Sequence, residues 1–483
     1  MVLYMNLGTG VTTMKITNKL LPILAIASLS ACTTVSKDSE EDIAKLKFDE
    51  SNYQSMFYPI INSVTKNEIK TAISKNNDIG DIAVLSSLNS LESGRLHQLN
   101  NNYQKSIIEY DKALSSIPKT NEEAKKQAKA TLLSKETYSY YDIDSPYDIP
   151  DYAIAYLYTY QALNYLSIGN ISKAQSSLDN LDVAGIWIDK QKMLVGGMKD
   201  LTKKYIKQDK IRLEKLGIND IESINAMSKY SRKIPDSFGS PVAYYLKSVL
   251  ELSKKDYTAS LDSLNKAHEY TAGNSYLDNS ISEAYRAKQS KKPFSMGMGR
   301  IVVIYEQGLV NMRDQIKAPL KLGKIGKRNF DFPVYSTNYQ FIGPKTISIS
   351  QNGKEITKTH TQTLYDGTLF AMKSLTESYA NIIVQDVVIE IIKHNYDKGF
   401  ALGGLLGSHL KINLSKTEPK RADMRSWLLL PNSVDLYEKQ IDSGKYSLNI
   451  NNIRQNIEVK QGKTTLLWVV NIGEFKKVNY FII

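Results

Sequence analysis

Residues that commonly carry chemistry at active sites are scarce in this sequence. Its 483 residues include one cysteine and five histidines. The histidines are far apart and form no HExxH motif, so we expect no metal site and no cofactor. No GxSxG nucleophile elbow and no phosphate-binding loop occurs either. A single thiol cannot form a disulfide within the chain, so packing alone must stabilise the fold.

The sequence also lacks an apolar run long enough to cross a bilayer as a helix, which takes about 20 residues. Its most apolar early stretch is "LLPILAIASLS", residues 20–30, which follows two lysines. A positive start, a short apolar core and small residues at the end are typical of a secretory signal peptide. The stretch ends in "LSAC", which resembles the bacterial lipobox. This pattern predicts cleavage between Ala31 and Cys32 and attachment of a diacylglyceryl group to the thiol; an ordinary buried cysteine is the alternative.

The targeting segment sets the expected compartment. Met14 begins a normal signal sequence by itself, so we expect residues 1–13 to be a mis-assigned start and residues 14–31 to be the signal peptide. No aspartate follows Cys32, which in lipoproteins of this type is typical of export to the outer membrane. Residues 32–50 are polar and charged and are predicted to form a lipidated tether. Since two or more acyl chains hold a protein firmly at a membrane, we expect a lipid-anchored protein that faces the periplasm.

Basic residues outnumber acidic ones, and the formal net charge is +12. A basic protein in this compartment can contact lipopolysaccharide phosphates or peptidoglycan carboxylates. A lysine-rich composition without functional meaning is an equal alternative. The basic residues are scattered rather than clustered, so we expect no nucleic-acid partner. The expected partners are the membrane, through acylated Cys32, and unidentified proteins, with the acidic envelope polymers as a further option.

Residues 51–290 carry apolar residues at three- and four-residue spacing, which predicts helices. Three segments, "NNYQKSIIEYDKALSSIP", "GNISKAQSSLDNL" and "KDYTASLDSLNKA", share one pattern in which a small residue follows another small residue twelve positions earlier. A large side chain would push two crossing helices apart, so we expect each pair to face each other within a helical hairpin: Gly94 with Ser106, Ala162 with Ala174, and Ser248 with Ser260. The pattern resembles the tetratricopeptide repeat, and its irregular spacing leaves the number of hairpins open.

Tyrosines are concentrated just before the second of these segments. Tyr152, Tyr156 and Tyr160 recur at four-residue spacing and therefore share one helix face. Such a stripe can line a groove for a peptide or a sugar, because tyrosine offers a flat ring and a polar tip. Packing between helices is the alternative, and we favour it.

After about residue 290, strand patterns replace helical ones. The stretch "RIVVIY" predicts a buried strand, and "TISISQNGKEITKT" predicts a hairpin that turns at Asn352 and Gly353. Residues 364–395 are predicted to be helical, although "VVIEII" within them also suits a strand. From residue 425 on, short apolar strands alternate with turn residues, which predicts a small antiparallel β domain.

The segment "ADMRSW" offers a candidate site near the carboxyl terminus. Asp423, Arg425 and Trp427 would place a guanidinium beside an indole, and such a pair can bind anions or sugars. The favoured alternative is a buried ion pair and an aromatic anchor that fasten the β domain.

Blocks spread over nearly the full length resemble one family. They are "QALNYLSIGN", "GRIVVIYEQGLV" followed by "IKAPL", "ADMRSWLLLP" and "SGKYSLNI", of which "RSWLLLP" is the most specific. The chain resembles a group of uncharacterised Gram-negative outer-membrane lipoproteins with a tetratricopeptide-like amino-terminal region and a β-containing carboxy-terminal region. That family implies no activity. It would carry an acidic-then-basic run where this chain has "AQSSLDNLD", so a charge-based role of that helix is not expected here.

We therefore expect an α+β protein: a leader at 1–31, a tether at 32–50, a solenoid of tetratricopeptide-like hairpins at 51–290, a mixed region at 291–424 and an antiparallel β domain at 425–483. The predicted function is a non-catalytic envelope scaffold that binds proteins through the solenoid, in envelope assembly, secretion or peptidoglycan synthesis. The alternative is an envelope hydrolase or polysaccharide-processing enzyme, which needs paired carboxylates in a cleft. Two carboxylates facing each other in a pocket would favour the enzyme, and a long open concave face without them would favour the scaffold.

Overall fold

The computed structural model describes most of the chain after residue 52. The described residues are 3–6, 11–14, 53–80, 82, 85–115, 117–118, 120, 122–123, 147–188, 216–218, 221–271, 273–397 and 422–483. The chain separates into two units, Met1–Asp49 and Glu50–Ile483. In the first unit, β1 (Leu3–Asn6) pairs antiparallel with β2 (Val11–Met14). The predicted apolar run, the lipobox with Cys32 and the tether lie outside the described residues, so all that follows concerns the second unit.

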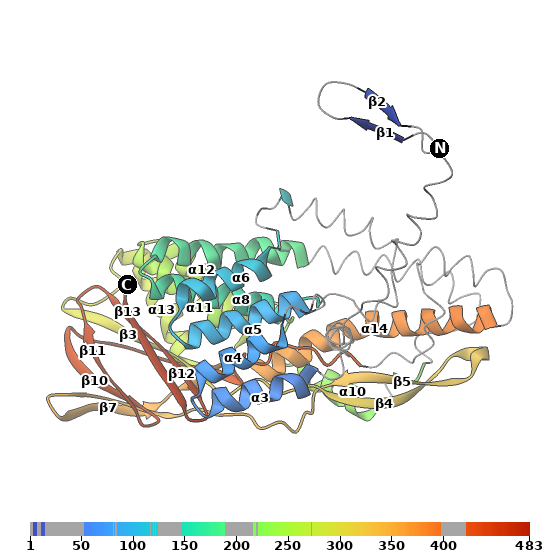
Figure 1. The fold of residues 1–483 in the computed structure, drawn as a ribbon. Helices are drawn as coiled ribbons and strands as arrows, with labels where there is room; N and C mark the ends of the chain where they lie inside the picture. Colours follow the sequence, from blue (N-terminus) through green and yellow to red (C-terminus); the bar gives the residue numbers. More distant parts are fainter. Residues whose placement is uncertain are drawn as a thin grey trace. The chain divides into compact units, whose positions relative to one another are not determined.

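Helices fill the amino-terminal part of the second unit (Figure 1). They are α3 (Tyr53–Thr65), α4 (Ile69–Ile79), α5 (Ser86–Leu99), α6 (Tyr103–Leu114), α8 (Asp151–Ser167), a helix over residues 171–188, α10 (Glu222–Ser231), α11 (Pro241–Ser253), α12 (Tyr257–Tyr270) and α13 (Ser275–Ser290). The last of them ends where the predicted helical region ends.

Three of the helix pairs turn in the same way. In each turn one residue has a positive φ, and the next residue is an asparagine or aspartate whose side chain caps the second helix by accepting a hydrogen bond from a backbone N–H. A left-handed residue reverses the chain, and the capping side chain satisfies an N–H that the new helix leaves unpaired. The turns are Asn101–Asn102 between α5 and α6, Gly169–Asn170 after α8, and Lys255–Asp256 between α11 and α12.

Two β-sheets follow the helices. The five-stranded sheet has the order β13 (Phe475–Ile482), β12 (Thr464–Ile472), β3 (Met298–Gln307), β9 (Ser433–Asp442) and β8 (Gln362–Asp366). Within it β12 and β3 run parallel, and the other neighbours run antiparallel. The four-stranded antiparallel sheet has the order β11 (Ile453–Val459), β10 (Gly444–Ile450), β6 (Thr346–Gln351) and β7 (Lys354–His360).

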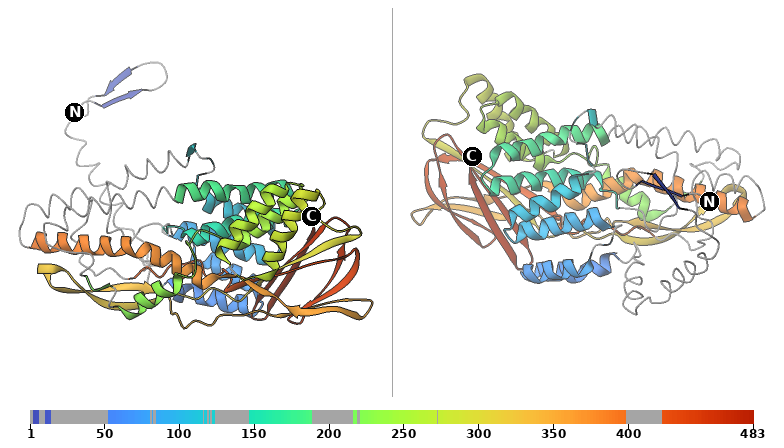
Figure 2. Two further views of the ribbon diagram at one scale, coloured as in Figure 1. Left: turned by 180° about the vertical axis from the view of Figure 1, so that it is seen from behind. Right: turned by 45° about the horizontal axis from the view of Figure 1, so that its top comes forward.

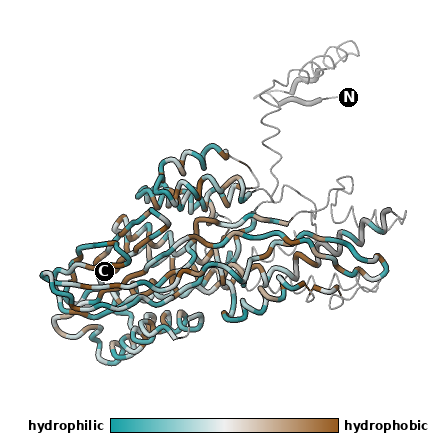
Figure 3. Tube along the Cα trace, turned by 90° about the horizontal axis from the view of Figure 1, so that it is seen from below, coloured by the Kyte–Doolittle hydropathy of each residue, from teal (hydrophilic) through white to brown (hydrophobic). Residues whose placement is uncertain are grey.

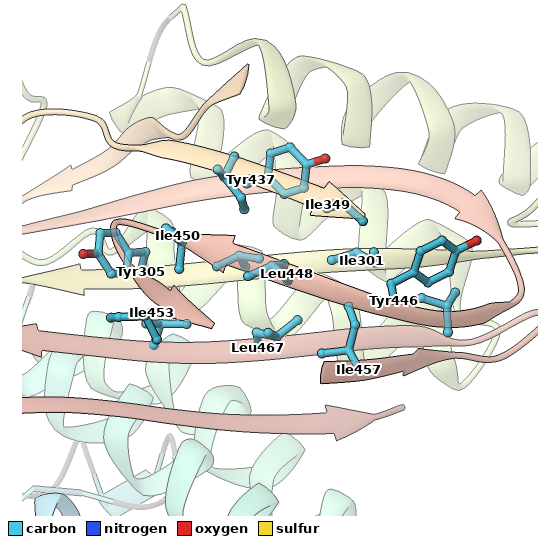
Figure 4. Close-up of a cluster of buried hydrophobic side chains, with 14 of the residues drawn as sticks. Ile301, Tyr305, Ile349, Tyr437, Tyr446, Leu448, Ile450, Ile453, Ile457 and Leu467 are labelled. Atoms are coloured by element: carbon cyan, nitrogen blue, oxygen red, sulfur yellow. The ribbon is translucent and has the colours of Figure 1, made fainter. Parts of the chain in front are cut away.

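The two sheets pack face to face, and their facing side chains form a hydrophobic core. Figure 4 shows part of it, with Ile301 and Tyr305 of β3 and Leu467 of β12 opposite Ile349 of β6 and Leu448 of β10. The helices lie on one side of the five-stranded sheet, and β10 and β11 lie on the other (Figure 2). The five-stranded sheet is therefore a middle layer that is covered on both faces, which explains why β3 reads as a continuous apolar run.

A third group of elements extends beyond this body. The ribbon of β4 (Asp314–Lys321) and β5 (Lys327–Val334), joined through a short 3-10 helix at Gly323–Ile325, lies beside α10 and the long helix α14 (Gly367–Asp397) (Figure 1). Hydrophobic and hydrophilic residues alternate along the trace in Figure 3. Among the described residues, no helix combines the length and the apolar character that a membrane span requires.

The α+β class is confirmed, and so is the hairpin at Asn352–Gly353, which joins β6 to β7. The helix predicted at 364–395 is also present, but it begins at Gly367, because residues 364–366 belong to β8. The prediction of a separate antiparallel β domain at 425–483 is wrong. Its strands β9 and β12 flank β3, β10 pairs with β6, and the contact between β12 and β3 is parallel. The physical reason is that an apolar strand such as β3 must pair on both edges, and its two neighbours come from the end of the chain.

Candidate functional site

The first helices of the hairpins lie in the interior of the molecule. In α8 nearly every residue from Tyr152 to Leu166 is buried, and in α11 burial is continuous from Pro241 to Leu252. The second helices, α6 and α12, bury one face each. The first helices are thus enclosed between the second helices and the five-stranded sheet. The inner face, which an open solenoid would present to a partner, is covered by the chain's own sheet.

The predicted small residues lie inside the hairpins. The hydroxyl of Ser106 donates to the carbonyl oxygen of Gly94 at 2.7 Å, and that of Ser260 donates to the carbonyl oxygen of Ser248 at 3.0 Å. A Cβ at Gly94 would lie 2.4 Å from two ring carbons of Tyr110. These contacts bring the first and third pairs together. Ala162 and Ala174 are both fully buried in consecutive helices.

The tyrosine stripe lies against the sheet region and does not line an open groove. Tyr152, Tyr156 and Tyr160 are 2%, 1% and 0% exposed. The ring of Tyr156 packs 4.9 Å from that of Tyr365 in β8, and Tyr160 packs edge-on to Trp427 at 5.8 Å. The groove hypothesis is therefore wrong, because the face that carries these rings is the one that the carboxy-terminal half of the chain covers.

The "ADMRSW" residues do not form an open anion or sugar site. Arg425 donates through Nε to Asp423 Oδ1 at 3.0 Å, and a second guanidinium nitrogen reaches Oδ2 at 3.0 Å. Arg313 donates to the backbone oxygen of Asp423 at 3.0 Å. Trp427 is fully buried. The indole of Trp427 packs on Tyr110 of α6 and Tyr160 of α8 and so fastens this segment to the helices, whereas the ion pair lies within the segment.

Buried charges join the helices to the middle sheet. The guanidinium of Arg95 in α5 pairs with Glu306 of β3, and both side chains are almost completely buried. Glu306 also accepts a hydrogen bond from the indole nitrogen of Trp468 at 2.9 Å. The Arg95 guanidinium lies 4.1 Å from the ring centre of Tyr160. Each charge of this pair has the other as its partner, so removing one of them would leave an uncompensated buried charge and be costly.

A second buried carboxylate, that of Glu92, lies on α5 one turn before Arg95. Glu92 accepts hydrogen bonds from the backbone N–H of Leu428 at 2.7 Å, from that of Leu429 at 3.3 Å and from the hydroxyl of Tyr53 at 3.2 Å. Burial raises the pKa of Glu92 to about 8, although these three donors act in the opposite direction. This group ties α5 to the start of the carboxy-terminal segment.

A pair of carboxylates lies at the other end of the helix–sheet interface. Glu438 of β9 accepts hydrogen bonds from the hydroxyls of Tyr245 and Ser280, and Arg300 lies 3.7 Å away. Glu283 of α13 is hydrogen-bonded to Glu438. Burial and the neighbouring Glu438 raise the pKa of Glu283 to about 7.

These two carboxylates line a pocket of about 390 Å³ between α13, β7 and β9. Its wall also carries the cations Arg286 and Lys439 and the ring of Tyr437. This pocket is the candidate binding site of the molecule. In the described part of the chain, no three histidine, cysteine, aspartate or glutamate side chains are grouped as metal ligands.

Sequence reasoning missed Glu283 and Glu438 because they lie far apart in the chain and belong to no motif. One signal was available for the neighbouring carboxylate: Glu306 follows directly on the apolar run Ile301–Tyr305 of "RIVVIYEQ". A charge at such a position must find a buried partner, so it marks where another layer of the fold supplies one.

Comparisons with known proteins add little to this description. No protein-family model matches the sequence, and no curated protein matches it. A solved structure that matches is a tetratricopeptide repeat protein from Parabacteroides merdae. It is 12% identical, the match covers 49% of this chain and 99% of that chain, and the TM-score is 0.14. Identity and TM-score at this level do not establish a shared fold.

Proposed function

We propose that the protein is a lipid-anchored scaffold of the bacterial envelope, held at the outer membrane through acylated Cys32 and facing the periplasm. The observation that carries the proposal is the "LSAC" sequence, which places the lone cysteine of the chain directly after a charged start and a short apolar run. The described body of the protein begins well after this cysteine, so lipidation would leave its contacts unchanged.

Partner proteins would bind to the outer helices rather than inside the solenoid. The hairpins share the small-residue spacing of tetratricopeptide repeats, but their inner face is covered by the sheet. Large apolar side chains remain exposed on the second helices: Ile108 of α6 is 56% exposed, and Ile171 is 38% exposed. A contiguous patch of exposed apolar side chains is typical of a site where proteins bind, and we propose that these two side chains belong to one such patch.

Lipidation is tested on the protein purified from envelopes. Mass spectrometry should find a chain that begins at Cys32 and carries acyl mass, and Cys32→Ala should leave the longer precursor without it. Thr33→Ala, which keeps the thiol, is the matched control and should be processed normally. A mature chain that begins elsewhere and retains a free Cys32 thiol would contradict the proposal.

Partner binding is tested by chemical cross-linking in intact envelopes. Ile108→Lys together with Ile171→Lys should reduce the set of cross-linked proteins while thermal stability stays unchanged. Ile356→Lys, which alters a similarly exposed side chain on β7 (43% exposed), is the control and should leave the set intact. The same loss in the control would place the partner surface elsewhere.

A second candidate is an envelope hydrolase, and one observation favours it: two carboxylates, Glu283 and Glu438, meet in a pocket. Their arrangement differs from that of glycosidases, whose carboxyl groups stand about 5–10 Å apart to admit a sugar and a water, since these two hydrogen-bond each other. Digestion of envelope polysaccharide by the purified protein, lost in Glu438→Gln, would establish the enzyme. A wild-type protein that leaves the polymer intact would contradict it.

A further inference from the structure

The pocket arises where one strand leaves the middle sheet. The chain runs from β7, which pairs with β6 in the outer sheet, through Thr361 into β8, which pairs with β9 in the middle sheet. The pairing of β8 with β9 stops at Leu436. Beyond that residue the side of β9 away from β3 faces β7 across the pocket, and α13 covers the opening. The chain thus passes from the outer sheet to the middle sheet between β7 and β8 and leaves a cavity of about 390 Å³ there. This volume is within the range of small-molecule sites.

Two buried polar atoms of this wall lack a partner within the described residues. Oε2 of Glu283 makes no hydrogen bond, and neither does the hydroxyl of Tyr437. Tyr437 is 1% exposed, so water does not readily compensate for the missing partner. Buried polar groups are usually hydrogen-bonded, and an unpaired one is costly. An unpaired carboxylate oxygen and an unpaired hydroxyl, from two residues that line the same pocket, together call for a ligand that brings hydrogen-bond donors.

The charges of the wall indicate the kind of donor. Glu438 already has Tyr245, Ser280 and Arg300 as partners, whereas the side-chain neighbours of Glu283 are Gln440 and the like-charged Glu438. A ligand cation placed at the unpaired Oε2 of Glu283 would favour the charged form of this carboxyl and offset the repulsion from Glu438.

The rim of the pocket carries the opposite charge. Arg286 lies one helical turn after Glu283 on α13, and Lys439 follows Glu438 on β9. Residues three apart on a helix have Cβ atoms about 5–6 Å apart. A ligand that meets both charges of the wall therefore has its cation and its anion several bonds apart rather than on one carbon.

We propose that this pocket binds a zwitterionic ligand whose primary ammonium contacts Glu283 and Tyr437 and whose carboxylate contacts Arg286 and Lys439, as in a lysine-like residue at the carboxyl end of a peptide. The chemistry of the site does not depend on lipidation. The proposed envelope location would supply peptides of the cell wall or of proteins as sources, and failure of one proposal leaves the other intact.

Calorimetric titration of the full chain in detergent tests the ligand chemistry. The probe is Nα-acetyl-L-lysine, which carries the ammonium and the carboxylate. Nα-acetyl-L-norleucine lacks the ammonium, and Nα-acetyl-L-lysine amide lacks the carboxylate. We expect the probe to bind at least tenfold more tightly than either analogue. Equal binding of norleucine and lysine, or no binding at millimolar probe, would overturn the proposal.

Three variants assign the contacts. Glu283→Gln keeps the shape of the side chain and should weaken binding of the probe at least tenfold. Arg286→Gln should weaken binding of the probe but not binding of Nα-acetyl-L-lysine amide, because the amide has no carboxylate for Arg286 to contact. Asp278→Asn, an exposed carboxylate on the same helix that pairs with His268, should change nothing. Thermal melting of each variant shows whether it folds, and unchanged probe affinity in folded Glu283→Gln would refute the assignment.

A proton count gives a readout independent of affinity. The groups facing Glu283 are Glu438, Gln440 and Arg300 together with Arg286 and Lys439 on the wall. An ammonium that enters beside Glu283 lowers the pKa of this carboxyl, so binding near pH 7 should release part of a proton. Titrations in two buffers with different ionisation enthalpies should therefore give different apparent enthalpies. Identical enthalpies in the two buffers would place the ammonium away from Glu283 and count against the proposal.

Discussion

At the residue scale, Gly94 is the position where the hairpin leaves no room for a side chain. A Cβ there would meet the ring of Tyr110, and that ring is itself packed against Tyr160 and Trp427. We expect Gly94→Ala to lower the free energy of unfolding by about 1–3 kcal/mol through overpacking, although alanine favours a helix by about 1 kcal/mol over glycine. Urea denaturation of the full chain measures this. Ser86→Ala, at the exposed start of the same helix, should be neutral, and equal stability of the two variants would contradict the close approach.

Lys477 is a buried cation whose pKa makes stability depend on pH. It lies on β13, donates to the carbonyl oxygen of Gln98 and is 9% exposed. Burial, together with the charge of Arg95, lowers the pKa of Lys477 to about 7. The unfolded chain keeps this proton up to the ordinary value of 10.5, so the folded protein binds fewer protons between these two values. Stability contributed by this group must therefore rise with pH across that window.

The comparison with Lys477→Met isolates this effect. Between about pH 7.5 and 9.5 the wild type should gain stability relative to the variant, by about 1.4 kcal/mol for each pH unit in the steep part of the window. Lys476→Met, which removes an exposed lysine one residue earlier, should follow the wild type. Parallel curves for wild type and Lys477→Met in urea denaturation would show that Lys477 is charged in the folded protein throughout.

At the element scale, the hairpins were predictable from sequence and the sheet was not. The two small residues of a hairpin, twelve positions apart, and the left-handed and capping residues of the turn between them all lie in one continuous segment, so that segment contains the whole signal. The pairing of β3 with β9 and β12 joins residues from opposite ends of the carboxy-terminal half. The residues of a strand indicate that it is buried, but they do not indicate which strands pair with it.

The candidate pocket was missed for the same reason. Glu283 is an ordinary glutamate on an amphipathic helix, and nothing near it in the sequence marks it. It becomes distinctive because α13 crosses β9 where β8 has ended, which brings Glu438 to it. For Tyr152, Tyr156 and Tyr160 the sequence left both a groove and the favoured packing open, because a stripe of rings looks the same whether it meets a ligand or another layer of the same chain.

The contact between α5 and β3 rests on the pair of Arg95 and Glu306. Arg95→Met leaves a buried carboxylate without its cation and should cost about 3–5 kcal/mol of stability. Adding Glu306→Gln removes the orphaned charge while keeping an acceptor for Trp468, so the double variant should be more stable than the single one. Denaturant unfolding of the full chain measures both.

The matched control for this cycle is an exposed pair. Lys112 on α6 contacts Glu109 at 2.9 Å, and the lysine side chain is 59% exposed. Lys112→Met should change stability little, because exposed pairs contribute at most about 1 kcal/mol. If the double variant of the buried pair proved no more stable than Arg95→Met, the loss would come from packing of the long side chain rather than from charge.

At the scale of the whole molecule, helices and sheets share their interior. Without the middle sheet, the inner helices would expose their buried faces to water. Without the helices, the middle sheet would expose Glu306 and Glu438 together with its apolar residues. The proposed scaffold would offer its outer helices as a fixed surface, because the inner face is already occupied by its own sheet. Because helices and sheets share their interior, we expect residues 50–483 to unfold as one unit.

The three tryptophans of the chain make this testable. Trp427 and Trp468 are both fully buried where the helices meet the carboxy-terminal half, whereas Trp187 lies in the helix over residues 171–188. In Trp187→Phe, fluorescence therefore reports the helix–sheet interface, while far-ultraviolet circular dichroism is dominated by the helices. We expect the two signals to change at the same urea concentration, since a cooperative transition gives coincident curves for different probes. A helical signal that survives after the fluorescence has changed would show that the solenoid stands without the sheet, and its inner face would then be open to a partner.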